Sequence, residues 1–268
     1  MKALFKPLLV LVAAIIIGAI LLFSSNIFSK DTKASKETQK QEKTITVGLD
    51  DTFVPMGFKD ENGEIVGFDV DVAKKAFSKM GYKVKFQPIN WDMKESELNN
   101  KTIDAIWNGY TKTPAREEKV AFTDAYFKNT QAIITLKDSD INTIDDLKGR
   151  IVATQTASSS LEAMEKTAGL IEGLKNGQPI LFDTFNEAFM DLEAGRVDAL
   201  VADEILARYY IGQKNPEDYK ILKDNLGDEE YCVGLRKDDT KLLEELNSTL
   251  NEMKSNGEFD EIKNKWFK

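Results

Sequence analysis

The sequence contains no histidine and only one cysteine, Cys232. Without histidine, the chain lacks the commonest general base and the commonest metal ligand, and it cannot form Ser-His or Cys-His nucleophile arrangements. A lone cysteine excludes an internal disulfide framework and any metal site built from several cysteines. We accordingly predict no catalytic residues, no metal site and no cofactor.

The sequence also lacks an excess of basic residues. It has 36 Lys and Arg against 45 Asp and Glu in 268 residues, a formal net charge of −9. Nucleic acid is therefore excluded as a partner, because its phosphates require a basic footprint. The hydrophobic content of 42% and the charged content of 30% are ordinary for a globular protein, and the length fits one large or two medium domains.

Polar side chains are absent from Leu8–Phe23, and the charge-free stretch continues to Ser29. A helix from Pro7 to Ser29 would be about 34 Å long, enough to cross a bilayer core of roughly 30 Å. The two lysines before it would stay inside, which puts the rest of the chain outside the cell membrane. We predict that residues 1–29 form a membrane anchor or a cleaved signal segment. The anchor is preferred because the apolar run is long for a signal and no clear small-x-small cleavage site follows it.

The remaining sequence divides into a linker and a structured body. Residues 30–43 contain one alanine and no other apolar side chain, which predicts a flexible linker. From Thr44 onward, strand patterns alternate with helix patterns, and this alternation predicts an α/β architecture with largely parallel sheets. The predicted strands lie at 45–49, 84–86, 103–107, 151–154 and 199–202, and the predicted helices at 69–80, 143–148, 159–166, 185–194, 204–211 and from 242 to about 257.

Two segments of the body resemble each other. Glu97–Ile106 and Leu192–Leu200 each contain a helix end, a basic residue and a strand with an Asp-Ala pair. Each strand runs into a polar loop, at residues 108–113 and 203–204. Because ligands of open α/β sheets lie beyond the carboxyl ends of strands, the repeat indicates two lobes that face each other across a cleft.

The segment Ile103–Tyr126 predicts a place to hold a small carboxylate. The pattern indicates a buried strand that runs into a polar loop. Within six consecutive positions, this loop contains Thr111, Thr113 and Arg116. A guanidinium can bind a carboxylate with two parallel hydrogen bonds, and Thr111 adds a hydroxyl and a backbone N–H. The alternative is an exposed arginine paired with one of the two glutamates that follow it.

Two further strand ends carry candidate polar groups. Thr154–Ser160 bridges a strand and a helix start, where Ser158 or Ser159 would cap the helix and the free N–H groups would attract an anion. A plain capping serine is the alternative. Asp203 ends an apolar strand, where a lone carboxylate is costly without a partner. That partner would be either a ligand ammonium or the N-terminus of the helix that follows.

Other candidates follow strand ends and would contact a ligand side chain. Phe53 and Trp91 either pack on the ligand or belong to the core, and Asp50 and Asp51 could bind a polar or cationic group. A carboxylate clamp on one side and an ammonium acceptor on the other match the two charged groups of an α-amino acid.

Several segments of the body carry a resemblance to a known family: Gly67–Asp71 (GFDVD), Ile103–Arg116, Val120–Tyr126 (VAFTDAY), Asp145–Gly149 (DDLKG), Gly195–Asp203 (GRVDALVAD), Val233–Asp239 (VGLRKDD) and Asn256–Phe267 (NGEFDEIKNKWF). From about Thr44 to the end, the chain resembles the amino-acid-binding members of the extracellular solute-binding protein family 3, the receptors of ABC importers. The resemblance implies a two-lobed periplasmic-binding-protein-like (type II) fold, with residues 44–126 and 231–268 in lobe 1 and 131–226 in lobe 2. Two segments near Tyr126–Gln131 and Leu226–Tyr231 would cross between the lobes.

The family pattern implies a carboxylate clamp formed by Arg116 and Thr111 and completed from the other lobe by Ser158. Two positions depart from that pattern. Ala157 stands where the family often has glycine, which leaves the backbone path before Ser158 open, and Ala115 replaces a common glutamate.

The same pattern implies that Asp203 accepts the ligand's α-ammonium, together with main-chain oxygen near Asn108 and Gly109. The side chain of the ligand would be contacted by the remaining residues: the aromatic walls Phe53 and Trp91, Asp50 as the residue that binds its polar group, and Gln155 as a residue that tunes the choice.

The resemblance implies a monomeric receptor that captures a polar or basic L-amino acid and delivers it to an ABC transporter permease with its ATPase subunit. It would lie at the outer face of the cytoplasmic membrane. No cysteine lies near the N-terminus, so the N-terminal segment, not a lipid, would hold it there. The alternatives are an amino-acid-sensing subunit of a signalling system and a dehydratase of the same fold, with Glu204 as its acid or base. Arginine, lysine, glutamine, histidine and cystine all remain open as ligands.

Overall fold

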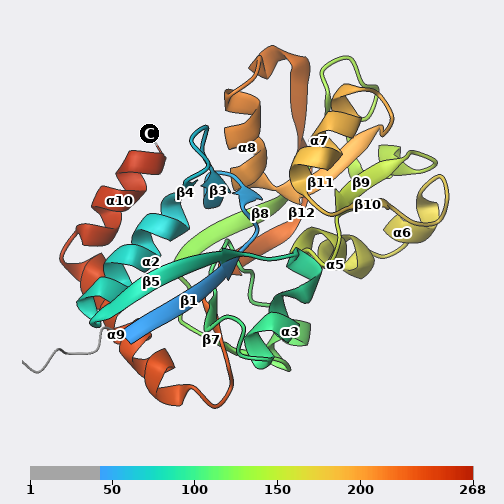
Figure 1. Ribbon diagram of the computed structural model, residues 1–268. Coiled ribbons are helices and arrows are strands. Elements are labelled where there is room, and N and C mark those ends of the chain that lie inside the picture. The colour runs from blue at the N-terminus through green and yellow to red at the C-terminus, as the bar shows by residue number, and fades with distance from the viewer. Residues whose placement is uncertain (1–42, 268) are drawn as a thin grey trace, which may run out of the picture. The chain divides into compact units, whose positions relative to one another are not determined.

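The computed structural model describes residues 43–267, which form two five-stranded sheets with helices packed on them (Figure 1). The predicted anchor or signal segment (1–29) and residues 30–42 of the predicted linker lie outside the described residues, whereas the last predicted linker residue, Lys43, begins the first strand. Between residues 43 and 267, no helix has the length and apolar character needed to cross a membrane.

The first sheet has the strand order β5-β1-β6-β13-β7. Its strand β1 pairs in parallel with β5 and β6, as predicted, whereas β13 runs antiparallel to both β6 and β7. Ile45, Val47 and Leu49 of β1 are buried, in agreement with their alternation in the sequence. The strands are β1 (Lys43–Leu49), β5 (Tyr82–Pro88), β6 (Ala105–Ile106), β7 (Ala121–Phe122) and β13 (Gly234–Leu235).

The second sheet has the order β10-β9-β11-β8-β12. Strands β10, β9 and β11 are parallel, but β8 runs antiparallel to both β11 and β12. The prediction of largely parallel sheets is therefore wrong for β8 and β12 here and for β7 and β13 in the first sheet. The strands are β8 (Phe127–Leu136), β9 (Val152–Gln155), β10 (Ile180–Phe182), β11 (Ala199–Asp203) and β12 (Tyr219–Tyr231).

The chain passes between the two sheets twice, once from β7 to β8 and once from β12 to β13. The two predicted crossing segments fall mainly within β8 and β12. These strands pair there, with Phe127 opposite Tyr231 and Asn129 opposite Glu229. Side chains of residues from both halves of the sequence therefore meet where the chain changes sheets.

A small antiparallel sheet of β2 (Thr52–Phe53), β3 (Gly57–Lys59) and β4 (Ile65–Val66) follows β1. Gly67 then leads directly into helix α2, which begins at Phe68. The sequence patterns did not predict this sheet, because its strands are only two or three residues long. It places Phe53 just beyond the end of β1.

Helices α2, α3, α9 and α10 belong with the first sheet, and α5 to α8 with the second (Figure 1). The spacing of apolar residues in 69–80 predicts that Val72, Ala73, Ala76, Phe77 and Met80 face the core. The first four are fully buried, and Met80, just after α2, is partly buried. Helix α5 has the predicted bounds, and the predicted helix at 143–148 is a short 3-10 turn at Ile144–Leu147. The helices are α2 (Phe68–Lys79), α3 (Lys94–Asn99), α4 (Pro114–Glu117), α5 (Ser159–Lys166), α6 (Leu170–Gly173), α7 (Phe185–Glu193), α8 (Glu204–Gly212), α9 (Thr240–Ser255) and α10 (Glu258–Trp266), with further 3-10 turns at Trp91–Met93 and Pro216–Asp218.

Candidate functional site

A buried carboxylate of α2, that of Asp69, holds the loop that follows β6 in place through hydrogen bonds. The backbone N–H of Gly109 donates to Asp69 Oδ2 at 2.6 Å, and the Tyr126 hydroxyl donates to the same oxygen at 2.8 Å. Burial raises the pKa of Asp69 to about 7, although both hydrogen bonds act to lower it. Gly109 has φ +56°, and a Cβ there would lie 2.9 Å from Phe53 Cε1, so a larger residue would disturb this loop.

The next residues of this loop pair with the strand crossing. Cys232 N–H donates to the Tyr110 carbonyl, and Lys112 N–H donates to the Glu230 carbonyl, which sets Thr111 opposite Tyr231. Among the described residues, no oxygen accepts a hydrogen bond from the Thr111 N–H. Thr111 therefore keeps a backbone donor for another molecule.

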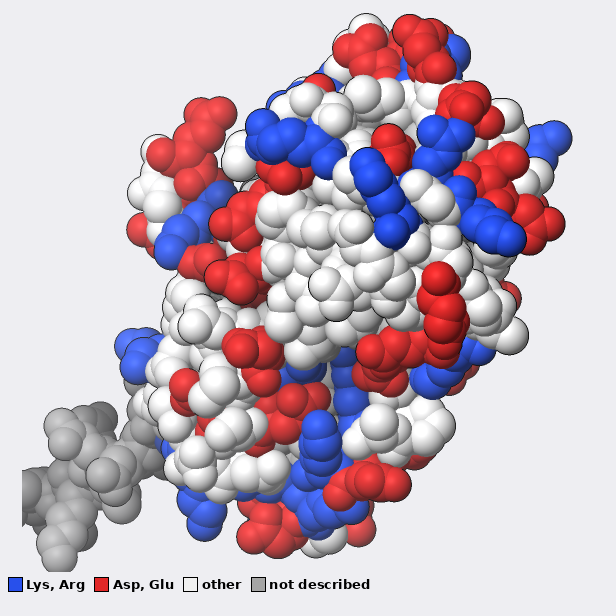
Figure 2. Space-filling model, turned by 90° about the vertical axis from the view of Figure 1, so that its right-hand side faces the viewer, with Lys and Arg blue, Asp and Glu red and all other residues white. Residues whose placement is uncertain are grey.

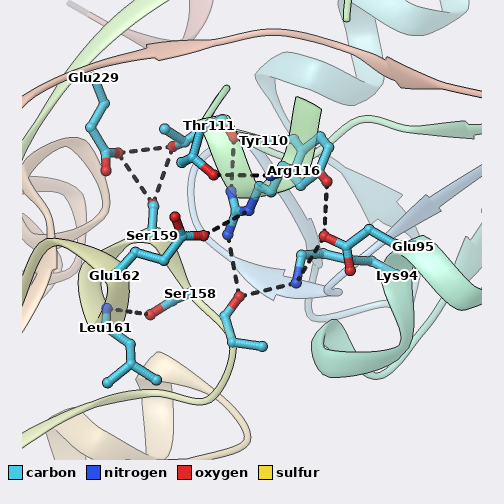
Figure 3. A network of polar contacts seen from close by, with 12 residues as sticks. Lys94, Glu95, Tyr110, Thr111, Arg116, Ser158, Ser159, Leu161, Glu162 and Glu229 are labelled. Atoms are coloured by element: carbon cyan, nitrogen blue, oxygen red, sulfur yellow. Dashed lines mark hydrogen bonds and ion pairs between the residues drawn. The ribbon is translucent and has the colours of Figure 1, made fainter. Parts of the chain in front are cut away.

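Arg116 lies in α4 and is only 3% exposed. Its Nη1 donates to the Thr111 carbonyl at 2.9 Å, and its Nη2 donates to the Ala157 carbonyl of the second sheet's side at 3.2 Å. Its Nε lies 3.3 Å from Glu162 Oε1 (Figure 3). The alternative, an exposed arginine paired with Glu117 or Glu118, is wrong, because Arg116 is buried and its ion-pair partner is Glu162. Glu117 pairs with Lys112 instead.

Ser158 is the N-cap of α5. Its Oγ accepts a hydrogen bond from Leu161 N–H at 3.1 Å and donates to the Gln155 carbonyl at 2.7 Å. This hydroxyl is therefore used in capping, and a contribution of Ser158 to the clamp remains a prediction. The hydroxyl of Ser159 instead lies 3.2 Å from Oγ1 of Thr111, which belongs to the loop after β6 in the first sheet. The run of three serines at 158–160 was the sequence signal for this position.

Asp203 ends β11 and is buried. Its Oδ1 accepts hydrogen bonds from the side chains of Asn129, Gln131 and Tyr231, the last two at 2.9 Å. It is the N-cap residue of the helix that follows, α8, but its side chain makes no capping hydrogen bond there, so the helix N-terminus acts on it only through the helix dipole. Burial, and then the nearby Glu229, raise the pKa of Asp203 well above its usual value. Within residues 43–267, no Lys or Arg forms a salt bridge with Asp203, and no group donates to its Oδ2.

Glu229 joins this cluster from β12 and was not predicted. Its Oε2 accepts from Thr111 Oγ1 at 2.8 Å, Gln131 Nε2 at 2.9 Å, Ser159 Oγ at 3.2 Å and Asn129 Nδ2 at 3.3 Å. One carboxylate oxygen thus contacts the loop after β6, the strand β8 and the start of α5. The only sequence signal was its place in a predicted crossing segment.

Asp50 and Gln155 contact each other. Gln155 Nε2 donates to Asp50 Oδ2 at 2.8 Å, while Thr52 donates to Oδ1 through its N–H at 2.9 Å and its hydroxyl at 2.7 Å. Burial raises the pKa of Asp50 despite these hydrogen bonds. Asn108 accepts from the Asp50 N–H at 3.1 Å, and the Asn108 amide nitrogen is buried without a partner in the described part of the chain.

The two predicted aromatic walls are buried but pack on different partners. Phe53 contacts Phe185 of α7 edge-on, with ring centroids 6.0 Å apart. Trp91 contacts Tyr110 edge-on at 5.8 Å. The structure therefore brings Arg116, Thr111 and the start of α5 into one network, and Asp203 reaches it through Gln131 and Glu229. Asp50 and Gln155 form a separate contact.

A groove of about 1060 Å³ lies beside this network. It is lined by the loop after β6, by α5, by the start of α8 and by the paired parts of β8 and β12, and it includes Thr111, Ser159 and Glu229. Its charged side chains are of both signs. Figure 2 shows one face of the molecule, on which basic and acidic side chains lie both above and below an uncharged central area. Within residues 43–267, no cluster of three or more His, Cys, Asp or Glu could hold a metal ion.

The sequence and the fold of this chain are similar to those of known proteins. The sequence is 29% identical to the arginine-binding extracellular protein ArtP of Bacillus subtilis (strain 168), over 98% of each chain. The fold is similar to that of an ABC uptake transporter substrate-binding protein of Streptococcus pneumoniae with bound histidine (TM-score 0.82, 42% identity, 84% of this chain and 92% of that chain). It is also similar to an ancestral arginine-binding protein bound to glutamine (TM-score 0.77, 41% identity, 84% of this chain and 97% of that chain). Residues 45–268 match the family model of these proteins, and the chain belongs to the bacterial extracellular solute-binding proteins, family 3.

Proposed function

We propose that this protein is the extracytoplasmic substrate-binding protein of an ABC importer and that it captures a polar or basic L-amino acid between two lobes. The observation that carries the proposal is Asp203, a buried carboxylate at a strand end with uncharged hydrogen-bond donors and no salt bridge to a cation within residues 43–267. Such a carboxylate is costly unless a cation reaches it. The α-ammonium of an amino acid is a cation of suitable size.

In this proposal, one lobe consists of residues 44–126 and 231–268, and the other lobe consists of residues 131–226. The two five-stranded sheets and the two chain passages between them support this division. Contacts such as Asp50 with Gln155 and Arg116 with Glu162 would form when the lobes close, and ligand binding would favour the closed form.

The ligand's carboxylate would bind Arg116, the free N–H of Thr111 and the N–H groups at the start of α5. Arg116 already donates to two carbonyls, and each of its terminal nitrogens keeps one further N–H. A helix N-terminus adds a favourable field for an anion. Asp203 Oδ2, with main-chain oxygen near Asn108 and Gly109, would bind the ammonium. Both charged groups of the amino acid would then have a partner of opposite sign.

The side chain of the amino acid would lie toward Asp50, Phe53, Trp91 and Gln155. The relatives named above bind arginine, histidine or glutamine by their descriptions, which supports a polar or basic ligand. The protein would act as a monomer without a catalytic step. Held at the outer face of the cytoplasmic membrane by its N-terminal segment, it would pass the ligand to the permease and its ATPase subunit.

The test is a thermal-shift screen of the purified protein against arginine, lysine, glutamine, histidine and cystine. A ligand at 100 times its Kd raises the free energy of unfolding by about 2.7 kcal/mol, which corresponds to several degrees in Tm. Arg116→Ala and Asp203→Ala should each abolish the shift, because each leaves one charge of the zwitterion without a partner. If both variants keep unchanged affinity for every amino acid that binds the wild-type protein, the assigned site is wrong.

A further inference from the structure

Lys94 is a buried lysine beside the proposed carboxylate clamp. It begins α3 and is only 2% exposed, although lysine is rarely buried to this extent. Its Nζ donates to the Trp91 carbonyl and to the Ala157 carbonyl, each at 3.0 Å. It also lies 3.6 Å from Glu95 Oε1 and 5.0 Å from the centre of the Trp91 ring.

The partners of Lys94 fall into two groups. Trp91 and Glu95 are its neighbours in sequence and would stay with it in any arrangement of the sheets. Ala157 belongs to the loop between β9 and α5 on the second sheet. If the two sheets move apart, the hydrogen bond to the Ala157 carbonyl is therefore the one that Lys94 loses.

The Ala157 carbonyl accepts from two cations of the first sheet's side, Lys94 Nζ and Arg116 Nη2 (Figure 3). Ala157 has φ +53°, a conformation that residues other than glycine rarely adopt. It directly precedes Ser158, the N-cap of α5. The two cations thus hold an unfavourable backbone conformation at the point that orients the N–H groups of α5.

The Lys94 ammonium is costly to bury, and its surroundings reflect this cost. Burial, and then the neighbouring Arg116, lower the pKa of Lys94 to about 8. A charged donor that is already out of water forms a stronger hydrogen bond to a carbonyl than an exposed one does. The contact to Ala157 is therefore worth more than an exposed lysine contact.

We propose that Lys94 is a positioning residue that latches the closed cleft by holding the Ala157 carbonyl, and that it thereby slows the release of the bound amino acid. This inference depends on the proposed function. Lys94 does not touch the ligand in this account. It acts through Ala157, which sets the start of α5 against the ligand's carboxylate.

The ligand is the amino acid that gives the largest thermal shift. Stopped flow with fluorescence detection measures the rates at which this amino acid associates with the protein and dissociates from it. Lys94→Met keeps the length of the side chain and removes the ammonium. We expect dissociation to become about tenfold faster, the effect of losing one charge-assisted hydrogen bond, with a much smaller change in association. Lys94→Arg keeps a cationic donor and should restore most of the slow dissociation.

Lys220→Met is the matched control. Lys220 Nζ donates to the Ser139 carbonyl at 2.8 Å and to Asn142 Oδ1 at 3.0 Å, and all three residues belong to the second sheet's side. This substitution also removes a lysine that binds a backbone carbonyl, but no contact between the sheets. We expect it to leave the dissociation rate unchanged, whatever its effect on Tm.

The outcomes separate the two proposals. If Lys94→Met dissociates at the wild-type rate while the wild-type protein binds an amino acid, the latch is wrong and the proposed function stands. If the wild-type protein binds no amino acid, both are wrong. Should Lys94→Met not fold, Lys94→Gln provides the same measurement with a neutral side chain. A Lys94→Arg protein that releases ligand as fast as the neutral variant would also overturn the latch.

Discussion

At the scale of single residues, the cluster around Asp203 contains two acids that share their donors. Gln131 Nε2 donates to Asp203 Oδ1 and to Glu229 Oε2, each at 2.9 Å. The negative charge of Glu229 contributes to the raised pKa of Asp203. Burial is the larger cause of this raised pKa, and the nearby charge of Glu229 raises further the pH above which Asp203 can accept an ammonium.

Glu229→Gln should therefore extend ligand binding to lower pH. Only ionised Asp203 pairs well with an ammonium, so the affinity is lost as the pH falls through the raised pKa of Asp203. Removing the neighbouring charge lowers that pKa, and the midpoint of the loss moves to lower pH. Calorimetric titrations from pH 4 to pH 8 measure the midpoint. Asp228→Asn, which changes an exposed neighbouring acid, is the control, and an unmoved midpoint in Glu229→Gln would contradict the prediction.

Arg116 and Asp203 could be selected from the sequence because Arg116 follows two threonines in the polar segment after one apolar strand, and Asp203 ends another. Glu229 and Lys94 could not. Glu229 lies in a charged strand and reaches Thr111 only because β8 and β12 pair in one particular register. Lys94 meets Ala157 across 63 positions of sequence. Contacts of this kind depend on tertiary packing, which local patterns do not contain.

At the scale of secondary structure elements, Asp69 fastens the loop after β6 to α2. The sequence predicted α2 well, because its buried face repeats with helical spacing. It did not predict β12, whose central residues (KDNLGDEE) are charged and partly exposed, as befits the edge strand of a sheet. It also gave no separate helix at α10. Most elements with an apolar periodicity were predicted, but β8 was not, although its residues 131–135 are all buried. Elements placed mainly by their neighbours were not predicted.

Asp69 should make the stability of the protein depend on pH. Its pKa is about 7 in the folded protein against a usual value of 3.8, so between these values the folded chain holds a proton that the unfolded chain has lost. The free energy of unfolding therefore decreases as the pH rises through this window, by up to about 1.4 kcal/mol per pH unit.

Asp69→Asn should remove this decrease, since an amide keeps an acceptor for Gly109 and Tyr126 but does not ionise. Urea unfolding at several pH values between 4 and 7 gives the slope. Asp71→Asn changes a surface acid of the same helix that pairs with Lys265 and should leave the slope as it is in the wild type. Equal slopes for Asp69→Asn and the wild-type protein would refute the prediction.

At the scale of the whole molecule, the proposed site is surrounded by contacts between residues that belong with the first sheet and residues that belong with the second. They include the hydrogen bond from Gln155 to Asp50 and the aromatic contact of Phe53 with Phe185. The first of these joins the two polar residues proposed to read the ligand's side chain. The choice of amino acid would then depend on how strongly Gln155 hydrogen-bonds to Asp50, because this hydrogen bond competes with a hydrogen bond from the ligand.

Gln155→Ala should shift the preference of the protein toward a cationic ligand. Without the amide, Asp50 Oδ2 loses its donor and becomes free to accept from a guanidinium or ammonium. The ratio of the Kd for glutamine to the Kd for arginine should increase about tenfold. The ratio cancels any general weakening caused by the lost contact. Calorimetry with both amino acids measures it, and an unchanged ratio would exclude this role of Gln155.

The buried Cys232 has a practical consequence for observing motion of the sheets. Its thiol is buried, and burial raises its pKa to about 12, so almost none of it is the reactive thiolate at neutral pH. Met93 and Met190 are 44% and 53% exposed and lie on the first and the second sheet's side, respectively. Cysteines placed at these two positions would carry a pair of fluorescent dyes while the native thiol stays unlabelled. The distance between the dyes would then follow opening and closing in single molecules.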